Sequence, residues 1–131
     1  MHIEKILSHV PTKKLGKISK TVASAFYPAA TNLYSVGELP FARCVDCISY
    51  PIITKEQDNS FEKIPRWFIH ENKGVSTIHN GEIILTKVGT PCYASLLTDY
   101  DEIALSRTVL GITSIKNVNP YYLMIFLRCK Y

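Results

Sequence analysis

Short stretches of apolar residues recur along the chain, and the pattern is clearest in its second half. Glu82–Val88 is an apolar run of β-favouring residues with a glycine close to each end, which predicts a strand. The Gly89-Thr90-Pro91 break that follows turns the backbone. The pattern therefore predicts a strand that ends in a polar loop, where Lys87 and Thr90 reach outward.

Two further runs have the composition of strands. Ala104–Ile112 is rich in β-favouring residues and carries Arg107 among apolar neighbours, so we expect it to pair with one of the preceding strands. Pro40–Ile48 alternates enough to predict another strand, with Arg43 and Asp46 as its polar members. Both arginines are therefore expected on strands.

The end of the chain carries a helix signal. Asn119 is a good N-cap because its side-chain oxygen accepts from an unpaired N–H of the first turn, and Pro120 gives up a donor that would be unpaired anyway. A helix is therefore predicted over residues 119–131, with Arg128 and Lys130 in a last turn that favours cations. Its expected apolar stripe consists of Leu123, Phe126, Leu127 and Tyr131.

The first half of the chain gives weaker signals. Met1–Val10 has apolar residues at helical spacing and predicts a short amphipathic helix. Ile18–Ser24 predicts a strand. Phe26–Gly37 places turn formers between aromatic residues and predicts an exposed loop. Thr54–Lys63 is the most polar segment and predicts a surface loop.

These elements predict one α+β domain over residues 1–131, with a small mixed or antiparallel sheet, short flanking helices and a C-terminal helix. A hydrophobic fraction of 47% over 131 residues excludes a disordered chain. The formal charge of +4 is a mild basic excess, compatible with nucleic acid and equally with a basic soluble domain. We find no internal repeat.

No apolar run approaches the roughly 18 residues that a membrane-spanning helix needs. Residues 1–20 lack the apolar core of a secretory signal. We therefore expect a cytoplasmic protein without a membrane partner. Because thiols stay reduced in that compartment, cysteines 44, 47, 92 and 129 are expected to be free.

A pair of cysteines provides the main competing chemical signal. Cys44 and Cys47 have the spacing of zinc ligands, and the residues that could complete a site are Cys92, Cys129, His70 and His79. In a strand, residues three apart point to opposite faces, which favours separate thiols and no metal. The same residue types would also suit redox chemistry of the pair, or a nucleophile formed by Cys92 with a histidine. Phosphate-binding loops, dinucleotide fingerprints, paired catalytic carboxylates and methyltransferase motifs are missing, so we expect no catalytic residues and no cofactor.

The order of several motifs resembles a known family. These motifs are Leu15-Gly-Lys-Ile18, the glycine–proline–strand–aspartate segment Gly37–Asp46, Asn80–Gly89, Ser106-Arg107, and Asn119–Tyr131. In this order they resemble a target-recognition domain of a type I restriction–modification specificity subunit, over roughly residues 15–131. Each motif alone is short and loose, and the resemblance depends on the whole set.

The resemblance implies sequence-specific DNA recognition without catalysis. In that family separate subunits bind S-adenosylmethionine and methylate adenine, or cut the DNA. The implied partners are double-stranded DNA, a methyltransferase subunit, with or without an endonuclease subunit, and a second recognition domain or a second copy of the chain. Residues 1–14 would be an N-terminal extension, and the helix over 119–131 would lead toward a spacer helix. The competing hypothesis is a small protein-interaction or zinc-binding module without a nucleic-acid function.

Seven residues are candidates for DNA contact. Lys87 and Thr90 flank a turn where the backbone can approach a phosphate, whereas the planar guanidinium groups of Arg43 and Arg107 suit a guanine edge. The resemblance places the loop with Tyr27, Asn32 and Tyr34 on the DNA-facing side. Surface ion pairs are the competing role for the charged residues, and core packing is the competing role for the aromatic ones.

Overall fold

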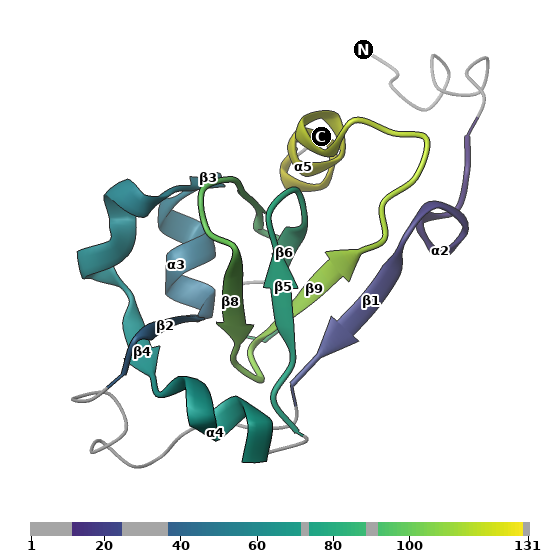
Figure 1. Ribbon diagram of the computed structural model, residues 1–131. Helices are drawn as coiled ribbons and strands as arrows, with labels where there is room; N and C mark the ends of the chain where they lie inside the picture. The colour runs from purple at the N-terminus through teal and green to yellow at the C-terminus, as the bar shows by residue number, and fades with distance from the viewer. Residues whose placement is uncertain (1–11, 25–36, 72–73, 89–91, 130–131) are drawn as a thin grey trace.

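The computed structural model describes residues 12–24, 37–71, 74–88 and 92–129, and these form two β-sheets with helices around them (Figure 1). The five-stranded sheet has the order β1 (Lys20–Ala23), β9 (Val109–Thr113), β6 (Ile83–Thr86), β7 (Ala94–Leu97) and β3 (Ile52–Ile53). The four-stranded sheet has the order β4 (Glu62–Ile64), β2 (Leu39–Ala42), β8 (Glu102–Leu105) and β5 (Thr77–His79). The helices are α2 (Leu15–Ile18), α3 (Cys44–Ser49), the 3-10 helix η2 (Lys55–Ser60), α4 (Arg66–Glu71) and α5 (Pro120–Arg128).

Both sheets are mixed. Antiparallel pairs dominate, but β2 runs parallel to β8 in one sheet and β3 runs parallel to β7 in the other. The predicted α+β class is therefore confirmed, with two small mixed sheets in place of one. Across the described residues, no helix is long and apolar enough to span a membrane.

The main core lies between the two sheets. Ile84 and Leu97 come from the five-stranded sheet, and Ile78, Ile103 and Leu105 come from the four-stranded sheet. All five side chains are fully buried in one cluster. Because strand side chains alternate between faces, the neighbouring residues point to the outer faces of the two sheets.

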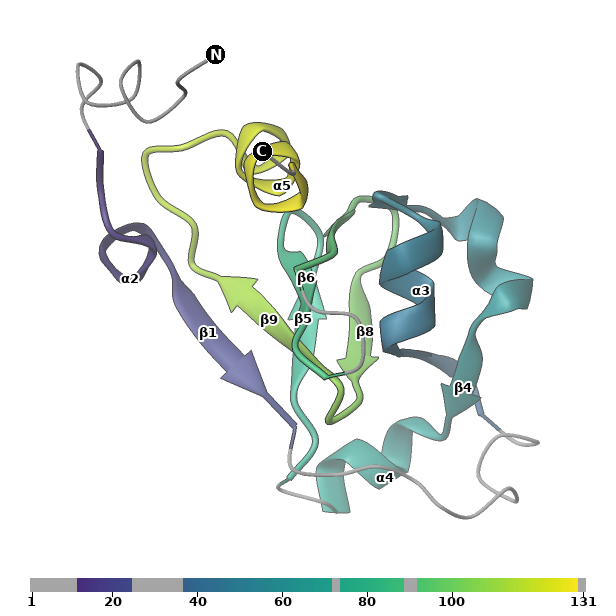
Figure 2. The same cartoon turned by 180° about the vertical axis from the view of Figure 1, so that it is seen from behind.

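Each outer face is covered by a helix, and the two helices lie at opposite ends of the molecule in both views (Figures 1 and 2). Helix α5 covers the five-stranded sheet, where the buried residues are Ile83, Ala94, Leu96, Ile112, Leu123 and Met124. Helix α4 covers the four-stranded sheet, where Phe68 and Ile69 pack against Leu39, Phe41 and Ile64. The resulting layers are helix, sheet, sheet and helix, so inner strands such as β2 and β7 are buried along their whole length, whereas no residue of the outer strand β1 is buried.

Three of the predicted elements are confirmed. The strand within Glu82–Val88 is β6, and the strand within Ile18–Ser24 is β1. Helix α5 begins as predicted, since the Oδ1 of Asn119 accepts from the N–H of Tyr121 at 2.9 Å.

The predicted apolar stripe of this helix is only partly right. Leu123 is buried and Leu127 is half-buried, but 44% of Phe126 is exposed. Met124, which was not part of the predicted stripe, is buried. Leu123, Met124 and Leu127 define the face turned to the sheet, and at 100° per residue Phe126 lies at the margin of that face.

The predicted strand over Pro40–Ile48 is wrong beyond Ala42. The chain leaves β2 at Arg43 and enters helix α3. Asp46 decides this, because its Oδ2 accepts from the backbone N–H of Arg43 at 2.8 Å and so caps the first turn. Arg43 is therefore the N-cap residue of a helix and not a strand residue.

The predicted single strand over Ala104–Ile112 is also wrong. It consists of β8 and β9, which belong to different sheets. The break lies at Ser106, whose Oγ accepts from the N–H of Thr108 at 3.2 Å. A serine that bonds the backbone two residues later favours a turn over a continuing strand.

The polar segment Thr54–Lys63 is not a loop throughout. It contains the 3-10 helix η2, followed by β4, which pairs with β2. The predicted helix over Met1–Val10, residues 26–36 of the predicted loop, Lys130 and Tyr131 lie outside the described residues.

Gly37 has a steric reason to be glycine. A Cβ atom there would lie 2.2 Å from the carbonyl carbon and oxygen of Lys63 in β4. The adjacent N–H of Glu38 donates to the oxygen of Ile64 at 3.2 Å. The backbone can therefore enter β2 beside β4 only without a side chain at position 37.

Candidate nucleic-acid interface

The segments that carry the two predicted arginines lie next to each other at one edge of the four-stranded sheet. Arg43 follows the last residue of β2, and Arg107 lies in the turn after β8. Strands β2 and β8 are parallel, with Ala42 opposite Leu105, so both strands end at the same edge of the sheet. The N–H of Ser106 donates to the oxygen of Ala42 at 3.0 Å and fixes the turn there.

Lys87 joins them from the other sheet. The N–H groups of Lys87 and Val88 donate to the carbonyl oxygen of Thr108 at 3.0 and 3.2 Å. The segment after β6 is therefore bound to the same turn that carries Arg107. We call Arg43, Lys87 and Arg107 the basic edge.

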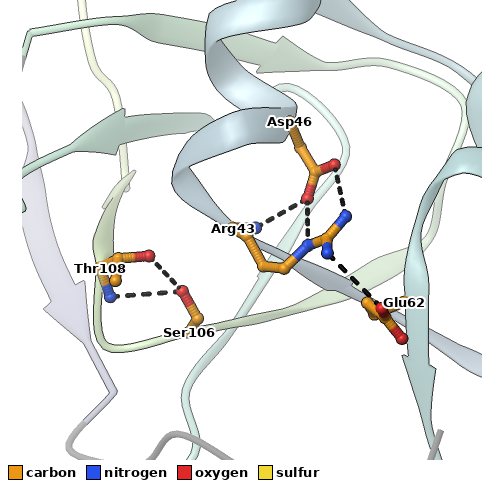
Figure 3. A network of polar contacts seen from close by, with 5 residues as sticks. All are labelled: Arg43, Asp46, Glu62, Ser106 and Thr108. Atoms are coloured by element: carbon orange, nitrogen blue, oxygen red, sulfur yellow. Dashed lines mark hydrogen bonds and ion pairs between the residues drawn. The ribbon is translucent and has the colours of Figure 1, made fainter. Parts of the chain in front are cut away.

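The turn from Ser106 to Thr108 holds the basic edge in place. Ser106 is fully buried, and its Oγ lies 2.6 Å from the Oγ1 of Thr108 (Figure 3). Arg107, between them, is exposed. Sequence reasoning treated Ser106 and Thr108 as strand residues and missed this supporting role, although a hydroxyl residue on each side of Arg107 is a signal for such a turn.

Arg43 is held in an ion-pair network (Figure 3). Its Nε and Nη2 lie 3.3 Å from the two carboxylate oxygens of Asp46, and its Nη1 lies 3.6 Å from the Oε1 of Glu62. Burial raises the pKa of the Asp46 carboxyl, while the hydrogen bonds from Arg43 oppose that rise. A contact between Arg43 and a guanine would compete with the ion pairs that Arg43 makes with these carboxylates. The side chain of Lys87, in contrast, is exposed to solvent.

The remaining four candidates are outside the described part of the chain. Thr90, Tyr27, Asn32 and Tyr34 all fall in the undescribed segments. Their predicted role in DNA contact stays a prediction.

The opposite ends of the same strands carry carboxylates. Glu102 begins β8 and lies 3.1 Å from the Nη1 of Arg66 and 3.6 Å from the Nε2 of His79. Glu82 lies 3.4 Å from the Nδ1 of His79, and Glu38 accepts from the backbone N–H of Arg66. At this end of the strands the carboxylates of Glu82 and Glu102 are therefore paired with cationic or titratable side chains.

The cysteine pair lies on a helix and not on a strand. Cys44 and Cys47 lie one turn apart on α3, so the expectation that they point to opposite faces of a strand is wrong. Strand β2 leads directly into helix α3, which carries both cysteines, and the sequence did not predict this strand-to-helix arrangement. Among the described residues, however, no three histidine, cysteine or acidic side chains lie close enough to share an ion.

Cys47 is fully buried against both sheets, and burial raises the pKa of its thiol to about 12. The unfolded chain releases this proton near pH ~8.5, so the stability that the neutral thiol contributes is present below that pH and is lost as pH rises toward about 12. We expect the difference in unfolding free energy between the native chain and Cys47→Ala to shrink by up to ~1.4 kcal/mol per pH unit above pH ~9. Urea titrations of both proteins between pH ~7 and ~10.5 measure it, and a constant difference would contradict the assignment.

The architecture matches part of a type I restriction–modification system. A chain from a structure of complex assembly and conformational transition in the type I R-M system superposes with a TM-score of 0.61 at 10% identity, over 94% of this chain and 30% of that one. A second match is the HsdS subunit from Thermoanaerobacter tengcongensis, with a TM-score of 0.53 at 13% identity, over 88% of this chain and 26% of that one.

These matches confirm the expected resemblance in fold. The chain spans less than a third of each matched chain, and its fold is that of a region of a type I specificity subunit. No protein-family model matches the sequence, and no curated protein matches it. The likeness is therefore one of architecture, at a sequence identity where function must be argued from the site.

Proposed function

We propose that this chain is a non-catalytic DNA target-recognition domain of a type I restriction–modification system, located in the cytoplasm. The observation that carries the proposal is the basic edge, where backbone pairing in an HsdS-like fold places the segments that carry Arg43, Lys87 and Arg107 next to one another. Phosphate contacts would position the domain on double-stranded DNA, and side chains at the same edge would read bases.

The roles follow from side-chain chemistry. Lys87 is a compact cation after a strand end and suits a phosphate, while Arg107 is exposed on a rigid turn and suits the O6 and N7 atoms of guanine. Arg43 would orient the interface through Asp46 and contact DNA only at the expense of that pair. Thr90, Tyr27, Asn32 and Tyr34 are proposed as further contacts.

The partners would supply the chemistry. A methyltransferase subunit would bind S-adenosylmethionine, and an endonuclease subunit would cut, while this chain would select part of the recognition site. A second recognition domain or a second copy would provide the other half-site.

Three phosphate contacts would make the affinity fall at least tenfold between about 50 and 200 mM salt. We expect Lys87→Ala to weaken binding to all sequences alike and to lower the salt slope by about one, and Arg107→Ala to cost roughly 1–3 kcal/mol on the cognate site alone. Competition titrations of cognate against scrambled duplexes, with the methyltransferase subunit bound, measure both effects. The cognate site comes first from selection in a random DNA pool.

The matched control is Lys55→Ala. Lys55 is exposed, and it follows β3, whose end lies beside the end of β7 and away from the basic edge. The DNA affinity and the salt slope of Lys55→Ala should equal those of the native chain. Full discrimination by Arg107→Ala together with an unchanged salt slope for Lys87→Ala would place the reading surface elsewhere. Salt-independent binding would reject the electrostatic mechanism itself.

A further inference from the structure

An apolar groove lies between α2 and α5, on the outer side of the five-stranded sheet. Its volume is about 440 Å³, and its apolar lining includes Leu15, Ile18, Val118, Tyr122, Phe126 and Leu127. Sequence reasoning did not assign it a role, and the basic edge contributes no residue to it.

The groove continues onto an apolar strip of α5. Tyr122 is 62% exposed, Ile125 is 60% exposed and Phe126 is 44% exposed. The rings of Tyr122 and Phe126 stack with centroids 6.2 Å apart. Because these residues are three and four apart, they form one continuous stripe along the helix. A stripe of this kind on the surface of a soluble domain marks an interaction site.

Charge distinguishes the groove further. The segments that build it, Thr12–Ser24 and Ile103–Cys129, contain no aspartate or glutamate. Lys13 lines the groove, Lys14 and Lys17 are exposed on or next to α2, and Lys116 is bound to α2 through its N–H, which donates to the oxygen of Ile18 at 2.8 Å. The apolar floor therefore has a cationic rim without carboxylates from its own segments.

We propose that this groove binds an amphipathic α-helix of a partner protein, with apolar residues toward Tyr122, Ile125 and Phe126 and carboxylates toward the lysines. An apolar groove with anchors at helical spacing suits the helix-in-groove mode of recognition. The cationic rim selects an acidic helix over a neutral or basic one.

Other occupants fit less well. A second copy would bring the same acid-free segments and set lysine against lysine. A DNA backbone would use the lysines but would leave the aromatic stripe without a partner. Membrane insertion needs a protruding apolar surface, whereas here Tyr122 and Phe126 line a concave one.

The test is a display selection against the full chain. The library holds peptides about five helical turns long, with fixed apolar residues at i, i+3, i+4 and i+7 and randomised flanking positions. Enrichment of aspartate and glutamate at the flanks is expected. The Ile125→Asp variant should bind the enriched peptides at least about tenfold more weakly, and the Lys13→Glu/Lys17→Glu variant should select basic flanks instead.

Val45→Asp is the matched control, because Val45 is 52% exposed on another helix, and its binding should be unchanged. Lys87→Ala should also retain the peptides, which separates this proposal from the one for DNA. Enrichment of neutral or basic flanks, or peptides that ignore Ile125→Asp, would overturn the proposal. Three further measurements test the competing occupants: sedimentation for a second copy, phosphatidylserine vesicles for a membrane, and a random duplex for DNA. Loss of self-association, vesicle binding or duplex binding in Ile125→Asp would also overturn the proposal.

Discussion

Replacement of Leu123 by alanine is expected to lower the free energy of unfolding by about 2–5 kcal/mol. Leu123 is 5% exposed and packs in the cluster with Ile83, Leu96 and Ile112 on the five-stranded sheet. Removing its isobutyl group loses both the transfer free energy and the contacts around the cavity left behind. Chemical denaturation followed by circular dichroism measures the change.

Phe126→Ala provides the internal comparison. The side chain lies on the same helix but is 44% exposed, so its truncation should cost clearly less, about 1 kcal/mol or below. Helix propensity changes little and in the favourable direction, because alanine is a better helix former than phenylalanine. Equal losses for the two variants would mean that α5 meets the sheet through a different face.

The sequence was informative where the signal was local. The N-cap at Asn119 and the proline after it fix the start of α5 without help from the rest of the fold. Likewise the apolar run in β6 is long enough, and close enough to glycines, to identify a strand. In both segments the residue types and their spacing favour a single element, and the structure confirms it.

The errors arose where a hydrogen bond from a side chain overrode the strand that the apolar pattern predicted. Cys44–Ser49 has a composition that suits a strand as well as a helix, and the hydrogen bond from Arg43 to Asp46 selects the helix. The residues around Ser106 are β-favouring on both sides, yet a side-chain hydrogen bond sends the chain from one sheet into the other. Apolar runs alone do not reveal either event.

The candidate site also combines features that the sequence predicted with features that it missed. Residue type singled out Arg43, Lys87 and Arg107 individually, but the assumption that the two arginines lie on strands was wrong. What unites the three is the parallel pairing of β2 with β8 and the hydrogen bonds from Lys87 and Val88 to Thr108. These are contacts between segments distant in sequence, so spacing could not predict that the residues share an edge.

Arg128 joins three elements, and its replacement by methionine is expected to cost about 2–4 kcal/mol. Its Nη1 donates to the oxygens of Cys47 and Ala94 at 2.8 and 2.9 Å, and its Nη2 donates to the oxygen of Ile48 at 2.9 Å. The guanidinium carbon also lies 5.1 Å from the centre of the Tyr93 ring. The sequence placed this cation at the end of its own helix, but its donors serve the last carbonyl groups of α3 and the start of β7.

Methionine keeps much of the apolar stem of Arg128 and removes only the charged donors, so the loss reports the hydrogen bonds. Lysine at this position should recover only part of the stability, because one ammonium group cannot span the carbonyls of α3 and β7 as a planar fork does. Arg66→Met is the matched control. Arg66 is more than half exposed in a surface ion pair with Glu102, and its replacement should cost at most about 1 kcal/mol. If Arg128→Met melted like the native chain, α5 and α3 would be held together by apolar packing alone.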